Sequence, residues 1–213
     1  MQDPWEHPDW YDLHDKDCCA GPERESEHYR ECIIALPPLD RDDHLIDLGA
    51  GTGKLALMIA QGYPKTGRIT LIDPNAYKLE RALEKLSPVF PSERVTVLNK
   101  PVGYGEALPK EEATVVTVGS MLMPAMMMHG GTLADALGWL RNTLAEMLAI
   151  LRPQGWLFDI ETLAAPWEQG TLEDPARRLA CQEFLEEYER AGFGSLECVY
   201  RFRDRIVLKA QKP

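Results

Sequence analysis

Apolar runs and amphipathic stretches alternate along most of this chain of 213 residues. Short apolar runs predict buried strands at residues 45–48, 68–73, 95–98, 113–118 and 156–161. Apolar residues at helical spacing predict helices over residues 22–36, 54–61, 76–86, 132–151 and 174–191. Strands that alternate with helices indicate an α/β fold, in which a mostly parallel sheet has helices on both faces. Two last runs, at 196–202 and 205–209, predict a hairpin that adds an antiparallel strand at one edge.

Prolines mark the ends of two predicted helices. Pro37 and Pro38 follow the first helix, and Pro153 follows the long helix over 132–151. A proline inside a helix removes a hydrogen bond and clashes with the preceding turn, so both helices should end there. The inner face of the first helix is expected to consist of Tyr29, Ile33, Ile34 and Leu36.

A glycine-rich turn joins the strand at 45–48 to the next helix. It has the sequence Asp-Leu-Gly-Ala-Gly-Thr-Gly over residues 47–53. Its glycines allow a tight turn and close approach of a ligand to the backbone, and the helix that follows presents free N–H groups. The G-x-G-x-G spacing differs from the G-x-G-x-x-G of dinucleotide-binding proteins. Asp47 would be unfavourable next to a pyrophosphate and suits a ligand that carries an ammonium and a sulfonium group.

A second carboxylate, that of Asp73, ends the following strand. An acid at this position accepts hydrogen bonds from ribose hydroxyls in nucleotide-binding sheets. Together, the strand, the glycine turn, the helix, the next strand and its terminal acid favour a bound nucleoside. The alternative is a glycine turn that binds no ligand.

This arrangement resembles the class I methyltransferases that depend on S-adenosylmethionine (SAM). The similar segments are 45–53, 71–74, 105–109 (Gly-Glu-Ala-Leu-Pro) and 151–156 (Leu-Arg-Pro-Gln-Gly-Trp). The resemblance implies a Rossmann-like three-layer sandwich with a seven-stranded sheet in the order 3-2-1-4-5-7-6, in which strand 7 is antiparallel. We expect a single domain, in which residues 1–36 form an N-terminal lid and helical segment and residues 37–213 form the methyltransferase-like domain.

The resemblance also implies which residues bind SAM and its product, S-adenosylhomocysteine (SAH). Asp47 and the first glycines of the turn would line the methionine end, Asp73 would bind the ribose, and Gly119 would lie near the sulfonium. The N-terminal region around Tyr11 would form part of a lid. The expected cofactor-binding residues are Tyr11, Asp47, Gly49, Gly51, Gly53, Asp73, Pro74, Tyr104 and Gly119.

Two positions depart from the family pattern. Tyr104 stands where the small-molecule branch commonly has an acidic residue that binds the adenine amine, and it could stack on or hydrogen-bond to adenine. Ala113 or Thr114 replaces the usual aspartate at the start of the fourth strand. These departures motivate a second hypothesis, a family member repurposed for cyclisation or elimination, such as aziridine ring closure in a natural-product pathway.

Two residues are candidates for catalysis. His129 lies between the fourth strand and the long helix, after the Met-rich segment 119–128, and histidine suits a general base near neutral pH. The alternative is an exposed or capping histidine. Glu161 ends the fifth strand, so its carboxylate is expected at the active-site edge, as a base or as a partner of an ammonium group. The alternative is a solvated loop acid. The methionines of 119–128 would line an adaptable pocket, form a partner surface or pack in the core.

The composition narrows the classes of function. A formal net charge of -11 disfavours nucleic acid as substrate or partner, because negative charges repel phosphates. No segment resembles a signal peptide or a membrane span, so we expect a cytoplasmic protein. The five cysteines have no metal-binding spacing, so we expect free thiols and no metal site.

We therefore expect a SAM-dependent methyltransferase that acts on a small molecule, by O- or N-methylation and alternatively by C-methylation, in specialised metabolism. The second hypothesis keeps the fold and replaces methyl transfer by ring closure or elimination. The third is a non-catalytic subunit whose Met-rich surface binds a partner enzyme. Either a homodimer or a heteromeric complex fits the sequence, and the fold does not decide among these functions.

Replacing His129 by alanine tests the predicted base. If His129 removes the proton of the methyl acceptor, turnover should fall about a hundredfold or more. The measurement is the rate of SAH formation at saturating acceptor. Near-normal turnover would remove His129 from this role.

Overall fold

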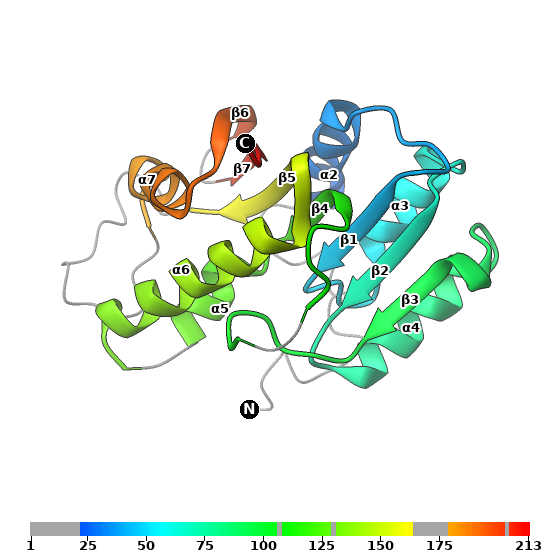
Figure 1. Ribbon diagram of the computed structural model, residues 1–213, viewed down its shortest axis with the longest axis horizontal. Coiled ribbons are helices and arrows are strands. Elements are labelled where there is room, and N and C mark those ends of the chain that lie inside the picture. Colours follow the sequence, from blue (N-terminus) through cyan, green and yellow to red (C-terminus); the bar gives the residue numbers. More distant parts are fainter. Residues whose placement is uncertain (1–21, 106–107, 129–130, 164–178, 203–204) are drawn as a thin grey trace.

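A seven-stranded sheet forms the centre of the molecule (Figure 1). The computed structural model describes residues 22–105, 108–128, 131–163, 179–202 and 205–213. The strands are β1 (His44–Leu48), β2 (Arg68–Ile72), β3 (Val95–Leu98), β4 (Ala113–Gly119), β5 (Leu151–Thr162), β6 (Gly194–Phe202) and β7 (Arg205–Gln211). Their order is β3-β2-β1-β4-β5-β7-β6. β7 pairs antiparallel with both of its neighbours, whereas the other pairs are parallel. The predicted fold class and strand order are confirmed.

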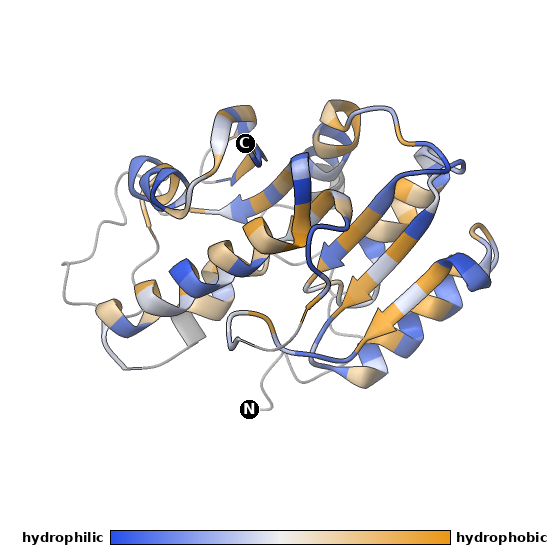
Figure 2. Ribbon diagram, viewed as in Figure 1, coloured by the Kyte–Doolittle hydropathy of each residue, from blue (hydrophilic) through white to orange (hydrophobic). Residues whose placement is uncertain are grey.

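Helices cover both faces of the sheet. α2 (Pro22–Ala35), α3 (Lys54–Gly62) and α4 (Ala76–Leu86) lie on one face, and α5 (Leu122–Met128), α6 (Leu133–Ile150) and α7 (Cys181–Ala191) on the other (Figure 1). A short 3-10 helix, Ser92–Arg94, precedes β3. Hydrophobic and hydrophilic residues alternate around α4 and α6 (Figure 2). Such helices bury one side and expose the other, which explains the helical spacing of apolar residues in the sequence.

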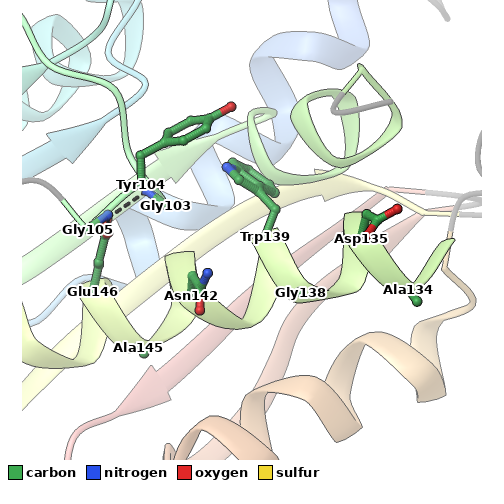
Figure 3. Close-up of a pocket in the computed structure, with 10 residues that line it drawn as sticks. All are labelled: Gly103, Tyr104, Gly105, Ala134, Asp135, Gly138, Trp139, Asn142, Ala145 and Glu146. Atoms are coloured by element: carbon green, nitrogen blue, oxygen red, sulfur yellow. Dashed lines mark hydrogen bonds between the residues drawn. The ribbon is translucent and has the colours of Figure 1, made fainter. Parts of the chain in front are cut away.

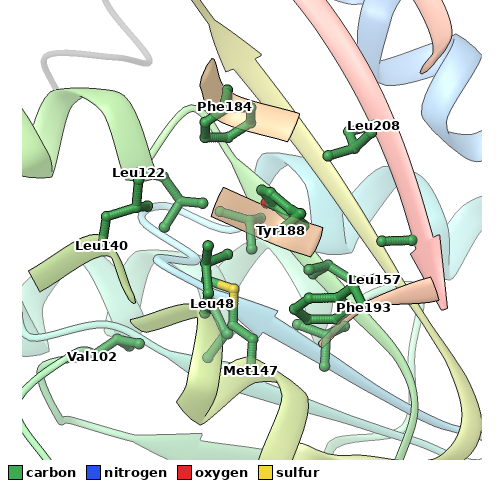
Figure 4. Close-up of a cluster of buried hydrophobic side chains, with 14 of the residues drawn as sticks. Leu48, Val102, Leu122, Leu140, Met147, Leu157, Phe184, Tyr188, Phe193 and Leu208 are labelled. Carbon is green, nitrogen blue, oxygen red and sulfur yellow. The ribbon is translucent and has the colours of Figure 1, made fainter. Parts of the chain in front are cut away.

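The core consists of two layers, one on each side of the sheet. On β1, Leu45 packs in the layer beneath α3, while Ile46 and Leu48 pack in the layer beneath α6 and α7. All the residues of β1 are buried, as is typical of a parallel strand covered on both faces. The second layer also contains Tyr188 of α7 (Figure 4). The central strands are therefore fixed on both sides, and the loops at their carboxyl ends are held in register.

β5 begins earlier than predicted. It starts at Leu151, which pairs with Ala113 of β4, whereas the sequence predicted a start at residue 156. Pro153 lies in an exposed segment between this pair and the next one, Val115 with Trp156, where the register shifts. A proline has no N–H to donate to a ladder, and an irregularity of this kind accommodates it.

Three further expectations about the helices need correction. Ile34 was expected on the inner face of the first helix, but its side chain is 73% exposed. The last helix begins at Cys181, not at residue 174, although residues 174–178 lie outside the described part. α5 was not predicted as a helix. α2 contacts α3 and the strands β5, β6 and β7. The division of the chain at residue 36 and the role of residues 1–36 as a lid stay predictions.

Gly53→Ala should destabilise the fold strongly. Gly53 has a φ of 78°, and an added Cβ would lie 2.7 Å from the Cβ of Ala82 in α4. Left-handed strain of about 1–2 kcal/mol and overpacking of about 1–3 kcal/mol should lower the free energy of unfolding by about 2–4 kcal/mol. Urea unfolding measures it. The matched control is Gly138→Ala within α6, where no atom of the described residues outside the helix's own backbone lies within 4 Å of the added Cβ; it should be neutral or stabilising. Equal effects of the two substitutions would contradict the packing argument.

Candidate functional site

The glycine turn lies at the carboxyl ends of β1 and β2. Gly49, Gly51 and Gly53 all have positive φ, at 66°, 52° and 78°. The backbone N–H groups of Gly49 and Ala50 donate to the carbonyl of Ile72, over 2.8 and 3.1 Å. The turn is thus tied to the end of β2, where Asp73 follows.

The Asp73 carboxylate connects the glycine turn to α4. Its Oδ2 accepts the N–H of Gly51 over 2.9 Å, and its Oδ1 accepts the N–H of Asn75 over 2.8 Å. Asn75 in turn caps α4 by accepting the N–H of Lys78. The side chain of Asp73 is 7% exposed, and each carboxylate oxygen has lone pairs for more than one donor. Asp73 can therefore hold the turn and still accept a ligand hydroxyl.

Asp47 presents a buried oxygen that has no hydrogen-bond partner among the described residues. The side chain is 2% exposed. Thr117 donates to its Oδ1 over 2.8 Å, and the backbone N–H of Ala56 in α3 also acts on the carboxyl and lowers its pKa, while Oδ2 itself forms no hydrogen bond with the described residues. Burial raises the pKa of Asp47 to about 7. A buried carboxyl oxygen without a donor is costly, and a cationic or N–H-bearing ligand group would satisfy it.

Gly119 ends β4 beside a side chain that sequence reasoning did not assign to the site. A Cβ at Gly119 would lie 3.4 Å from Tyr29 Oη and 3.7 Å from Leu55 Cδ2. Lys54 Nζ lies 5.4 Å from the centre of the Tyr29 ring. The sequence placed Tyr29 on the apolar face of the first helix, and it contained no local signal that this helix would lie over the end of β4.

Glu161 lies inside the protein at the end of β5. Its side chain is 1% exposed. Its Oε1 accepts the N–H of Leu122 over 2.5 Å, and its Oε2 accepts the N–H of Met123 over 3.3 Å. Burial, together with the nearby Asp159, raises the pKa of Glu161 well above the usual range. These contacts are those of a carboxyl that caps α5, and the catalytic role expected for Glu161 stays a prediction.

A second buried carboxyl lies two residues before Glu161. Asp159 Oδ2 accepts the hydroxyl of Tyr188 over 2.5 Å, while its Oδ1 has no partner within the described ranges. Burial raises the pKa of Asp159 to about 7. Asp159 and Glu161 face the α6 and α7 side of the sheet together, so the sheet carries two adjacent acids in its core.

Tyr104 lies at a separate cavity, beside α6 (Figure 3). The loop that contains it is held by Glu146, whose two oxygens accept the N–H groups of Gly103 and Gly105, each over 2.6 Å. The cavity has a volume of about 830 Å³ and is lined by Gly103, Tyr104, Gly105, Ala134, Asp135, Gly138, Trp139, Asn142, Ala145 and Glu146. Tyr104 is 61% exposed. The glycine turn does not line this cavity, and the adenine contact expected for Tyr104 stays a prediction.

The other position that departs from the family pattern has a structural role. Thr114 is buried, and its Oγ1 accepts the N–H of His44 over 3.2 Å. This bond joins the start of β4 to the start of β1. The methionines of the Met-rich segment differ in burial, because Met123 and Met126 of α5 are buried in the core, whereas Met121, just before α5, is half-buried.

The structure brings most of the expected cofactor-binding residues together. Asp47, the glycines of the turn, Asp73 with its successor Pro74, and Gly119 lie at the carboxyl ends of the neighbouring strands β1, β2 and β4. Ligands bind at this edge of open α/β sheets. Tyr11 and His129 lie outside the described residues.

Comparison with known proteins identifies the family. A family profile described as "Methyltransferase domain" matches residues 45–155, just over half of the chain. The chain belongs to the methyltransferase family. The resemblance to class I SAM-dependent methyltransferases that the sequence predicted is therefore confirmed.

One curated relative is the release factor glutamine methyltransferase of Thermosynechococcus vestitus (strain NIES-2133 / IAM M-273 / BP-1). It is 30% identical over an alignment of 160 residues, and the match covers 67% of this chain and 54% of the relative. The chain thus spans about half the length of that protein.

Solved structures share the fold at low sequence identity. The SAM-dependent methyltransferase SibL, in its apo form, has a TM-score of 0.65 at 16% identity. The match covers 89% of this chain and 55% of the SibL chain. A putative methyltransferase in complex with the Trm112 activator of Haloferax volcanii has a TM-score of 0.65 at 15% identity, with 90% of each chain covered. The [4+2]-cyclase SpnF has a TM-score of 0.63 at 18% identity, and the match covers 91% of this chain and 81% of the SpnF chain.

Among the described residues, none of the helices has the length and apolarity that a bilayer crossing needs.

Asp159→Asn should stabilise the protein more at high pH than at low pH. Because the pKa of Asp159 is raised to about 7 in the folded state, the stability associated with the neutral form is lost as the pH rises from about 4 to about 7. Asparagine stays neutral and can still accept the Tyr188 hydroxyl. The difference in free energy of unfolding, variant minus wild type, should therefore be about 1 kcal/mol or more larger at pH 8 than at pH 5. Urea unfolding measures it.

Comparing the two proteins at each pH removes the contributions of groups that do not interact with Asp159; Glu161, whose pKa is raised by Asp159, is part of the measured difference. His44 shows why such a comparison is needed. Burial lowers the pKa of His44 to about 4, so the stability that its neutral form contributes is lost as the pH falls from about 6.5 to about 4, whereas that of Asp159 is lost as the pH rises. The same difference between variant and wild type at both pH values would show that Asp159 does not ionise in this range.

Proposed function

We propose that this methyltransferase-family chain transfers the methyl group of SAM to an oxygen or nitrogen atom of a small molecule and releases SAH. The observation that carries the proposal is the pair of carboxylates around the glycine turn. Asp47 is buried with an unpaired oxygen, and Asp73 holds the turn with lone pairs to spare. Asp47 suits an ammonium group, and Asp73 suits the hydroxyls of a ribose.

The residues present fit SAM. Asp47 Oδ2 would accept an N–H of the ammonium group, because that oxygen has no protein donor among the described residues. Asp73 would accept the ribose hydroxyls, as acids at this strand end do. Gly51 would allow close approach, since the nearest atom that the described residues place beside an added Cβ, chain neighbours apart, is the Gly49 carbonyl oxygen at 3.9 Å. When bound, SAM supplies an electrophilic methyl carbon.

The protein's remaining task is to align and deprotonate the acceptor. His129 is our proposed base, from its place in the sequence between α5 and α6. Tyr29 lies beside Gly119 and would contact either the acceptor or the sulfonium end. A small acceptor is supported by the net charge of -11, which disfavours nucleic acid. Its place in specialised metabolism is part of the proposal.

A second candidate function keeps the fold and replaces methyl transfer by ring closure or elimination. The observation that favours it is the similarity in fold to the [4+2]-cyclase SpnF. The position of Tyr104 beside α6, away from the glycine turn, fits an altered adenine contact. Formation of SAH together with a product heavier by one methyl group would exclude this candidate.

Partner and location belong to the proposal as well. A heteromeric complex is supported by the neighbour solved with an activator protein, and a homodimer is the alternative. In the described part of the chain, Cys32, Cys181 and Cys198 are free, which is typical of a reducing compartment such as the cytoplasm.

Asp73→Ala should weaken SAM and SAH binding about tenfold or more, which is about 1.4 kcal/mol or above. The variant loses the ribose acceptor and the bond that fixes the Gly51 N–H. Calorimetric titration of wild type and variant with each ligand measures the change. Glu84→Ala is the matched control, because Glu84 is an exposed acid on α4, and it should bind like the wild type. A wild-type protein that binds neither ligand would overturn the proposed function.

A further inference from the structure

The segment after β4 is fastened to the end of β5 at two levels. The N–H of Ser120, which has a φ of 54°, donates to the carbonyl of Ile160 over 2.6 Å. The Glu161 carboxylate then accepts the N–H groups of Leu122 and Met123. Met121 lies between these attachments, so the path of its backbone is fixed on both sides.

The fixed segment places the Met121 side chain directly on the glycine turn. A Cβ at Gly49 would lie 2.8 Å from both Cγ and Sδ of Met121. Met121 therefore fills the space over Gly49 that a side chain would otherwise take. Over Gly51 no side chain of the described residues comes within 4 Å of the same position. Within this part of the chain, the turn is thus covered at its first glycine and open at its second.

Glu161 reaches this arrangement from inside the core. Leu122, whose N–H it accepts, is itself a member of the buried layer beneath α6 and α7 (Figure 4). A carboxyl at 1% exposure with backbone donors on both oxygens cannot reach an acceptor in the cleft without breaking those bonds. Its effect on a ligand must therefore pass through the backbone of residues 121–123.

We propose that Glu161 is a positioning residue, and that Met121 is the wall of the cofactor cleft that Glu161 holds in place. The thioether of Met121 would contact the methionine end of SAM or SAH as that end passes over Gly51. This inference rests on the proposed function, and it assigns to Glu161 a role other than that of a base.

The test is a double-mutant cycle read as SAH affinity. Met121→Ala and Glu161→Gln should each raise the Kd of SAH about fivefold or more. Glutamine fits the same space, but it keeps one acceptor oxygen and turns an NH₂ group toward a backbone N–H. If Glu161 acts through Met121, the double variant should bind within about twofold of Met121→Ala, because coupled residues are not additive. The proposal would be overturned if the increases in Kd of the two single variants multiplied in the double variant. It would also be overturned if Met121→Ala bound SAH as tightly as the wild type or more tightly.

Two further variants separate positioning from a general loss of stability. Tyr188→Phe removes a buried hydrogen bond from the same cluster without touching α5, so SAH affinity should stay within about twofold of the wild type. Met121→Leu restores the apolar bulk and should recover most of the affinity. A comparable loss of affinity in Tyr188→Phe would show that any damage to this core weakens binding.

An NMR measurement without ligand tests whether Glu161 positions Met121, whether or not the protein binds SAH. In protein with ¹³C-methyl methionine, the Met121 signal, assigned by its absence in Met121→Leu, should move in Glu161→Gln and stay in Tyr188→Phe. If the wild type binds no SAH, the proposed function fails, and the NMR shift still tests whether Glu161 positions Met121. An unmoved signal would overturn this inference alone.

Discussion

The hydrogen bond between the Gly51 N–H and the Asp73 carboxylate joins two segments that are 22 residues apart. It acts only because β1 and β2 pair in parallel, which brings their carboxyl ends to one edge of the sheet. The pairing leaves the glycine turn with left-handed backbone at three positions, a conformation that glycine adopts without steric cost. The turn is therefore shaped by its neighbours and not by its own sequence alone.

The same sheet contains three carboxyls that the core would be more stable without. Asp47, Asp159 and Glu161 are all buried, and burial raises the pKa of each. Isolated buried charges cost several kcal/mol each, and such groups shift their pKa values instead. Glu161 is compensated by backbone N–H groups, whereas Asp159 and Asp47 each accept one hydroxyl and keep one unpaired oxygen. Of these two, Asp47 is the one beside the glycine turn, where the ligand is expected, which is consistent with a site kept for binding.

The alternation of strands and helices was predictable because buried parallel strands are mostly apolar: β1 is buried at every residue, and three of its five residues are Leu or Ile. The glycine turn and Asp73 were predictable because their spacing is a property of the local chain. Residues whose role depends on packing between distant elements were not. Tyr29 reaches Gly119 from α2, and Ile34 is exposed although its spacing is that of an inner residue. The burial of Glu161 depends on where α5 lies, and α5 itself was not predicted.

The position of β7 between β5 and β6 constrains the order in which the sheet can form. β6 precedes β7 in the chain, yet its only strand partner within the described sheet is β7. β6 can therefore pair with β7 locally, as a hairpin, but it joins the rest of the sheet only where β7 pairs with β5. Pairing between β1 and β4, by contrast, joins residues about 70 positions apart, as in Leu45 with Val115. Such non-local contacts require a long loop to close before they contribute stability, so the parallel centre of the sheet should assemble more slowly than the hairpin.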